Sequence, residues 1–215
     1  MEGIIYKVQP YQETSKLVFV ITPEGKKTLI ARGAQKISSE YRTLTQYLTH
    51  IQFESSPKTM FTLKDAGIIN HFDHIKTSIN HLKVTAFVLE LYDKLIIEEG
   101  PIPTLYKKLI DFLYKPAFEL NSIRIAFLFL YELGYDVSLE PDGRKIKGFN
   151  ITQGRLIYEH ETFLSDVSMN DLITLLHIKK TTYDTIIEIT EDTYQTLKKF
   201  MVSYIEYHLN IRIKN

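Results

Sequence analysis

Three short runs that either alternate between apolar and polar positions or are wholly apolar open the chain. They cover residues 4–8, 17–21 and 28–31, are rich in β-branched side chains, and are separated by Pro10 and by the turn residues 23–25. A period of two over runs of this length is typical of β-strands, and the turn residues between them predict an antiparallel meander.

Two further runs extend this pattern. Residues 47–54 and 59–66 alternate again on either side of Pro57, after a polar stretch at 35–45 that we expect to be a connection. Five short strands are the usual complement of a small oligonucleotide-binding (OB) barrel. Residues 1–70 are therefore predicted to form a five-stranded OB-fold domain.

From residue 71 the period of the apolar positions changes to between three and four, which predicts helices. Asn121, Ser168 and Thr190 are placed as N-caps, and Asp171 would complete a capping box with Ser168. The third predicted helix is apolar almost all round and should be the buried centre of a helical domain over 71–215. The predicted fold class is therefore α+β. The predicted helices cover 75–95, 104–114, 122–133, 168–178 and 190–209.

Composition excludes several kinds of chemistry. The 215 residues include no cysteine, so disulfides, thiolate metal sites and cysteine nucleophiles are absent. No apolar run approaches the roughly 18 residues of a membrane-spanning helix, and the first ten residues do not resemble a secretory signal. We therefore expect a cytoplasmic protein with no membrane partner.

Positive charge is concentrated near the amino terminus, although the whole chain has 26 basic and 26 acidic residues. Residues 7–42 contain seven basic side chains and three acidic ones, a local charge of +4. Tyrosines at 11 and 41 lie beside these cations and could stack on bases, whereas Phe19 and Phe53 are mid-strand and are expected in the core. The alternative is that these charges only keep a strand surface soluble. The candidate DNA-binding residues are Lys7, Tyr11, Lys16, Lys26, Lys27, Arg32, Lys36 and Arg42, and we expect them to share one outward surface.

The order and spacing of residues in this segment resemble the RecO family of bacterial recombination mediators. The likeness rests on Val8, Pro10, Tyr11, Glu13, Ser15, Lys16, Thr22 and Gly25, followed by Ala31, Arg32, Gly33 and Ala34. It continues through LKDA (63–66), LELYDKL (89–95), LYELGY (130–135) and YIEYHL (204–209), and so covers nearly the whole chain.

This resemblance implies a non-enzymatic mediator of DNA repair that needs no cofactor. Such a protein would bind single- and double-stranded DNA, promote strand annealing, associate with RecR, engage the tail of single-stranded DNA-binding protein, and help to load RecA at gapped DNA near the nucleoid. Gln35, Ser38 and Glu40 occupy positions that are often basic in the family. The alternative is therefore a protein-interaction adaptor with little DNA affinity of its own.

The resemblance also implies a zinc-binding insertion, but this chain departs from it. Relatives carry two cysteine pairs near residues 136–161, where this sequence has only 142–145 and 157–160 in their place. No zinc can be held by these residues. We instead expect a small β-like excursion whose packing depends on Phe149, Leu156, Ile157 and Tyr158.

The helical domain would provide the surface for the partner tail. The acidic, apolar-ended tail would need an apolar pocket with a basic rim. Apolar surface for it is expected at Tyr106, Leu109 and Phe112, although ordinary amphipathic helices with solvated lysines would give the same pattern. The candidate rim residues are Lys107, Lys108, Lys115 and Arg124.

An enzyme is the remote alternative. His71, His74 and His81 are close in sequence, but on one helix the outer two would be about 15 Å apart by the helical rise, which is too far for one metal ion. GKKT at 25–28 lacks the first glycine and the spacer of a phosphate-binding loop. No nucleophile motif with a suitable base is present, so we expect no catalysis.

Overall fold

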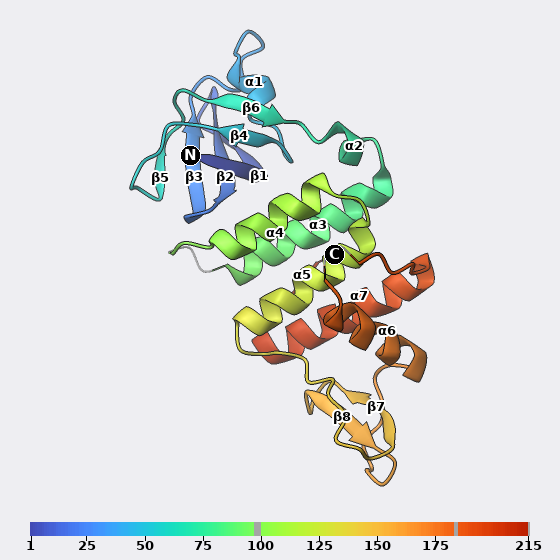
Figure 1. Cartoon of the computed structure of the whole chain (residues 1–215). Helices are drawn as coiled ribbons and strands as arrows, with labels where there is room; N and C mark the ends of the chain where they lie inside the picture. The colour runs from blue at the N-terminus through green and yellow to red at the C-terminus, as the bar shows by residue number, and fades with distance from the viewer. Residues whose placement is uncertain (97–99, 183–184, 215) are drawn as a thin grey trace. The chain divides into compact units, whose positions relative to one another are not determined.

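The structure is a computed structural model that describes residues 1–96, 100–182 and 185–214 (Figure 1). Its residues group into two compact units. The N-terminal unit comprises Met1–Thr85 and Tyr92–Tyr114, and the C-terminal unit comprises Ala86–Leu91 and Lys115–Asn215. The predicted boundary between residues 70 and 71 stays a prediction.

The N-terminal unit contains a mixed sheet of six strands in the order β5-β3-β2-β1-β4-β6 (Figure 1). Neighbouring strands are antiparallel except β3 and β5, which run parallel. The α+β class is thereby confirmed. The strands are β1 (Glu2–Tyr11), β2 (Ser15–Thr22), β3 (Gly25–Ala31), β4 (His50–Gln52), β5 (Met60–Thr62) and β6 (Gly67–Asn70).

The first three strands confirm the predicted meander, but the remainder of the sheet differs from the prediction. Pro10 does not end the first strand, because the chain turns two residues later, at Gln12 with φ +54°. The last two predicted strands shrink to three residues each. A sixth strand, β6, was missed because Ile68 and Ile69 are adjacent and about equally exposed, so the segment lacks the alternation of a half-buried strand.

One face of the sheet packs on a hydrophobic core. Val18 and Val20 of β2, two residues apart, contribute to it, and Leu29 and Ala31 of β3 lie on the same side. Phe53 belongs to this core, as predicted. The buried members are Ile5, Val18, Val20, Leu29, Ala31, Ala34, Leu44, Ile51, Phe53 and Leu63.

Among its described residues, four helices begin in the N-terminal unit: α1 (Tyr41–Leu44), α2 (Asp73–Lys76), α3 (Ile79–Leu95) and α4 (Pro103–Tyr114). The prediction of one long helix from residue 75 was wrong. The helix begins anew at Ser78, whose side chain accepts a hydrogen bond from the His81 backbone N–H at 3.3 Å. This is an N-cap that apolar periodicity alone does not reveal.

The C-terminal unit contains α5 (Phe118–Glu132), the β7–β8 hairpin (Ile146–Asn150 and Arg155–Tyr158), α6 (Met169–Lys180) and α7 (Glu191–Leu209). Helix α5 packs against α6 and α7 and is buried along most of its length, as predicted. Ser168 and Thr190 cap α6 and α7. Asn121 is not a cap, because α5 begins one turn earlier.

A buried histidine joins the sheet to α4 within the N-terminal unit. The ring of His50 in β4 is only 4% exposed, and its Nδ1 lies 3.0 Å from the Tyr114 hydroxyl while Nε2 lies 3.3 Å from that of Tyr106. Phe72 stacks near the ring, and the Glu2 carboxylate is 3.7 Å from Nε2. Burial lowers the pKa of His50, and the charge of Glu2 opposes this shift only in part.

We expect replacement of His50 by Gln to flatten the dependence of stability on pH between about 7 and 5. Because the pKa of the folded state lies below the unfolded value of about 6.5, the unfolded chain takes up a proton first, and stability falls as pH falls through this window. Urea unfolding at several pH values measures the free energy of unfolding of the wild type and of the variant. An equal change of this free energy with pH in both proteins would contradict the expectation.

We also expect Gly3→Ala to destabilise the sheet. A Cβ at Gly3 would lie 2.4 Å from Val20 Cγ1 and 2.8 Å from the Ile21 carbonyl oxygen, so the backbone of β2 must shift. Overpacking of this kind costs about 1–3 kcal/mol of unfolding free energy. Gly67→Ala is the matched control, since it meets only the flexible Gln52 side chain. Circular dichroism during urea unfolding compares the two variants.

Candidate nucleic-acid interface

Five of the eight predicted DNA-binding residues gather at one end of the sheet, which we call the basic end: Tyr11, Lys16, Arg32, Lys36 and Arg42. Strand pairing brings them together, because Lys16 lies opposite both Pro10 and Ala31. The following loop is fixed to the same place by a hydrogen bond of 2.9 Å from the Gln35 backbone N–H to the Thr14 carbonyl oxygen.

Charge is crowded at the basic end. Lys16 Nζ donates a hydrogen bond of 3.3 Å to Thr45 Oγ1, and the pKa of Lys16 is lowered by its burial and by the nearby charge of Arg42. Two like charges this close destabilise each other. A bound polyanion would relieve that repulsion, so the arrangement favours an anionic ligand.

Aromatic side chains are present at the same end. Tyr11 ends β1 and Tyr41 begins α1, both residues are half-buried, and Tyr41 also packs against the core of the sheet. Phe19 lies elsewhere: it faces away from the sheet core, next to Tyr6 and with Lys7 Nζ 5.0 Å from its ring centroid. The expectation that Phe19 is a core residue is thus wrong.

The other three predicted residues do not join the basic end, so the expectation of a single shared surface was wrong. Lys26 and Lys27 begin β3, about 13–17 Å along the strand from Ala31. Lys26 Nζ donates to the Asp93 carbonyl oxygen at 2.9 Å, and Lys27 is 3.6 Å from Glu24 with its side chain 11% exposed. Lys7 lies on the outer face with Phe19.

The residues predicted for the partner-tail site belong to both units. Arg124 is 5% exposed and donates hydrogen bonds to Asn121, Thr181 and Thr185, so it connects α5 with the segment after α6. Lys107 forms an ion pair of 3.4 Å with Asp111. The apolar side chains expected to line the groove, Tyr106, Leu109 and Phe112, are buried. Lys107, Lys108 and Lys115 stay a prediction.

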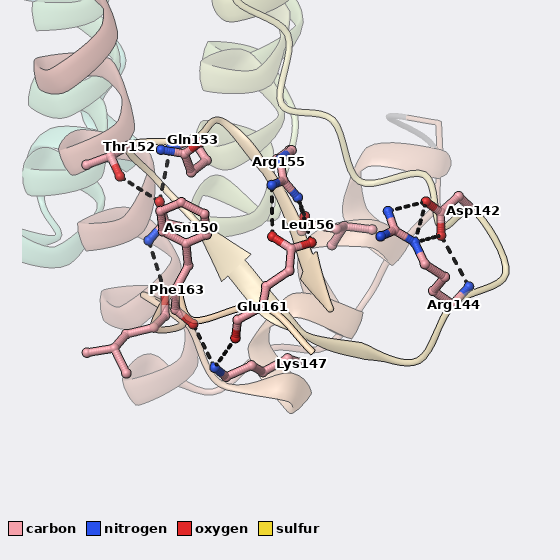
Figure 2. Close-up of polar contacts among 11 residues, drawn as sticks. Asp142, Arg144, Lys147, Asn150, Thr152, Gln153, Arg155, Leu156, Glu161 and Phe163 are labelled. Carbon is pink, nitrogen blue, oxygen red and sulfur yellow. Dashed lines mark hydrogen bonds and ion pairs between the residues drawn. The ribbon is translucent and has the colours of Figure 1, made fainter. Parts of the chain in front are cut away.

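Polar contacts hold the hairpin where relatives were expected to bind zinc (Figure 2). Arg155 binds Glu161 through both terminal nitrogens, and Arg144 binds Asp142 and lies with its guanidinium 3.7 Å from the Tyr158 ring centroid. These arginines lower the pKa of both carboxyls, that of Asp142 to about 2. The predicted β-like excursion is confirmed, with Phe149, Leu156, Ile157 and Tyr158 buried.

Metal and membrane sites can be assessed only where the structure describes the chain. Within those residues, no group of three or more His, Asp or Glu side chains could hold a metal ion, and no helix is long and apolar enough to cross a membrane. His71 precedes α2, His74 lies in it, and His81 lies in α3, so the three are not on one helix as assumed from sequence.

We expect the double substitution Asp142→Asn and Glu161→Gln to raise amide hydrogen exchange in β7 and β8. The substitutions remove the anionic partners of Arg144 and Arg155 while keeping side-chain size. Exchange in the wild-type hairpin should be unchanged by a metal chelator. Mass spectrometry of peptides from 146–158 measures both, and protection lost on adding chelator alone would contradict this account.

Comparison with known proteins agrees with the family resemblance. Residues 1–72 match the family model for the N-terminal domain of recombination protein O. The whole chain is 23% identical to the DNA repair protein RecO of Exiguobacterium sibiricum, covering 93% of that protein.

Shorter matches are closer. RecO of Listeria monocytogenes is 34% identical over 49% of this chain and 42% of its own length. RecO of Clostridium perfringens is 33% identical over 52% of this chain and 46% of its own length. A solved structure of asparaginyl-tRNA synthetase from Entamoeba histolytica aligns with 74% of this chain and 37% of its own, at 11% identity. The TM-score of 0.27 is too low to indicate a shared fold. Residues 1–72 thus match the family model of the RecO N-terminal domain, and the chain is similar over its whole length to a protein named DNA repair protein RecO.

Proposed function

We propose that this chain is a recombination mediator in DNA repair that binds single- and double-stranded DNA at the basic end of its N-terminal unit. The observation that carries the proposal is the convergence of Lys16, Arg32, Lys36 and Arg42 within the segment that matches the RecO N-terminal domain. Four cations with accessible tyrosines are the usual means of binding a sugar-phosphate chain with stacked bases.

The connectivity of the sheet supports an OB-type barrel as the scaffold. The order β5-β3-β2-β1-β4, with β5 parallel to β3, places the fifth strand beside the third and the fourth beside the first. The Glu54 backbone N–H also donates to the Lys64 carbonyl oxygen at 3.1 Å, which links the segments after β4 and β5. In this interpretation β6 is an addition to the barrel.

Binding at the basic end would not depend on sequence. Lysine and arginine would neutralise phosphates, and Tyr11 and Tyr41 would stack on bases of any identity. Two strands held this way keep their base edges free to pair, which suits a protein that anneals them. We further propose association with RecR, engagement of the tail of single-stranded DNA-binding protein, and help in loading RecA onto gapped DNA at the nucleoid in the cytoplasm, since these roles follow from the family.

A protein-interaction adaptor is the second candidate function. It is favoured by the zero net charge of the chain and by the contacts that engage Lys26 and Lys27 with the protein itself. In that case the chain would deliver partners to DNA without holding the DNA.

We expect Arg32→Glu with Arg42→Glu to abolish saturable binding of labelled single-stranded DNA without unfolding the protein. Both side chains are exposed, and the change reverses two charges at the basic end. The logarithm of the wild-type binding constant should fall linearly with the logarithm of the salt concentration, with a slope of about −0.7 per phosphate contacted. Fluorescence anisotropy over a salt series measures both quantities.

The control variant is Lys83→Glu with Lys199→Glu, which changes net charge equally at exposed positions on α3 and α7. It should bind like the wild type. Equal losses in both variants would contradict a local site, and no saturable binding by the wild type at low salt would favour the adaptor.

A further inference from the structure

A second group of cations in the N-terminal unit was not among those predicted. It surrounds an open recess of about 310 Å³ formed by the segment that joins β4 to β5 and by β5 itself. That volume suits one nucleotide or a small molecule. Its lining includes Glu54, Ser55, Ser56, Lys58, Phe61 and Lys64.

The side chains at the recess combine charge, hydroxyl groups and an aromatic ring. Lys58 and Lys64 are exposed, and within the described residues neither ammonium has an ion-pair partner, in contrast to Lys27. Ser55 and Ser56 offer hydroxyl groups, and Phe61 is half-buried against Phe53 with ring centroids 6.2 Å apart. Glu54 is the one acidic side chain in the lining, so the net charge is +1.

Strand pairing connects the recess to the basic end. Phe61 lies beside Leu29, and the Leu63 backbone N–H donates to the Ile30 carbonyl oxygen at 3.0 Å. Because β3 and β5 run parallel, Lys64 and Arg32 each lie two residues beyond the last paired positions, Thr62 and Ile30. Arg32 and Lys64 therefore follow the same end of two neighbouring strands.

We propose that the recess is a second subsite for single-stranded DNA, in which Lys58 and Lys64 bind phosphates and a base packs against Phe61. This inference rests on the proposed function, since it extends the DNA path from the basic end along β5. The charge favours a polyanion, and the ring favours an unpaired base over a duplex, whose bases are already stacked. The strand would thus cross the edge of the sheet between Arg32 and Lys64.

The test uses the full chain and a labelled 20-nucleotide oligothymidylate. Lys58→Ala with Lys64→Ala should weaken binding about tenfold at 50 mM salt and make the salt slope shallower by about 1.4, which corresponds to two lost phosphate contacts. Lys83→Ala with Lys199→Ala removes the same charge elsewhere and should change neither quantity. Equal losses in both variants, or an unchanged slope in the recess variant, would overturn the inference.

Cross-linking provides a readout that does not depend on affinity. An oligonucleotide that carries 5-iododeoxyuridine should form an adduct with Phe61 on irradiation, and Phe61→Leu should remove that adduct while keeping an apolar side chain in the core. Adducts found only at Tyr11 or Tyr41, with wild-type affinity in the recess variant, would refute the recess and leave the basic end intact. Absence of any DNA binding by the wild type would instead refute the proposed function.

Discussion

The pairing of β2 with its two neighbours is the constraint on which the rest of the N-terminal unit depends. Its register places Val18 and Val20 against Leu29 and the other core residues, so a slip by one residue would turn the apolar side chains to the opposite face. The same register places Lys16 next to the end of β3, where Arg32 follows. Core packing and the position of the cations are therefore fixed by one set of backbone hydrogen bonds.

Local patterns predicted the elements better than they predicted contacts between them. Short alternating or apolar runs between turn residues identified the first three strands, and Ser168 and Thr190 identified two helix starts, because each signal depends on neighbours in sequence. Strand β6 and the break at Ser78 lacked such a signal. Strand β6 depends on its pairing with β4. The break at Ser78 depends on a local N-cap, although the apolar positions continue with a helical period on both sides of it.

The candidate sites show the same division. Sequence identified candidate cations in both units, but it could not separate those that face solvent from those that bind the protein, such as Lys26 and Arg124. Lys58 and Lys64 were passed over because they lie outside the basic stretch in sequence, although the parallel pairing of β3 with β5 brings Lys64 near Arg32. The position of a lysine on the folded surface depends on the pairing of strands that are distant in sequence, and amino-acid composition does not reveal that pairing.

Strand β6 has a consequence for how the molecule behaves in concentrated solution. It is the last strand in the order of the sheet, and its four residues are Gly67, Ile68, Ile69 and Asn70, none of them charged. An uncharged strand with exposed isoleucines at the margin of a sheet offers backbone donors and acceptors to any extended chain that approaches. Self-association by strand addition would begin there, and a lysine introduced at position 69 would discourage it.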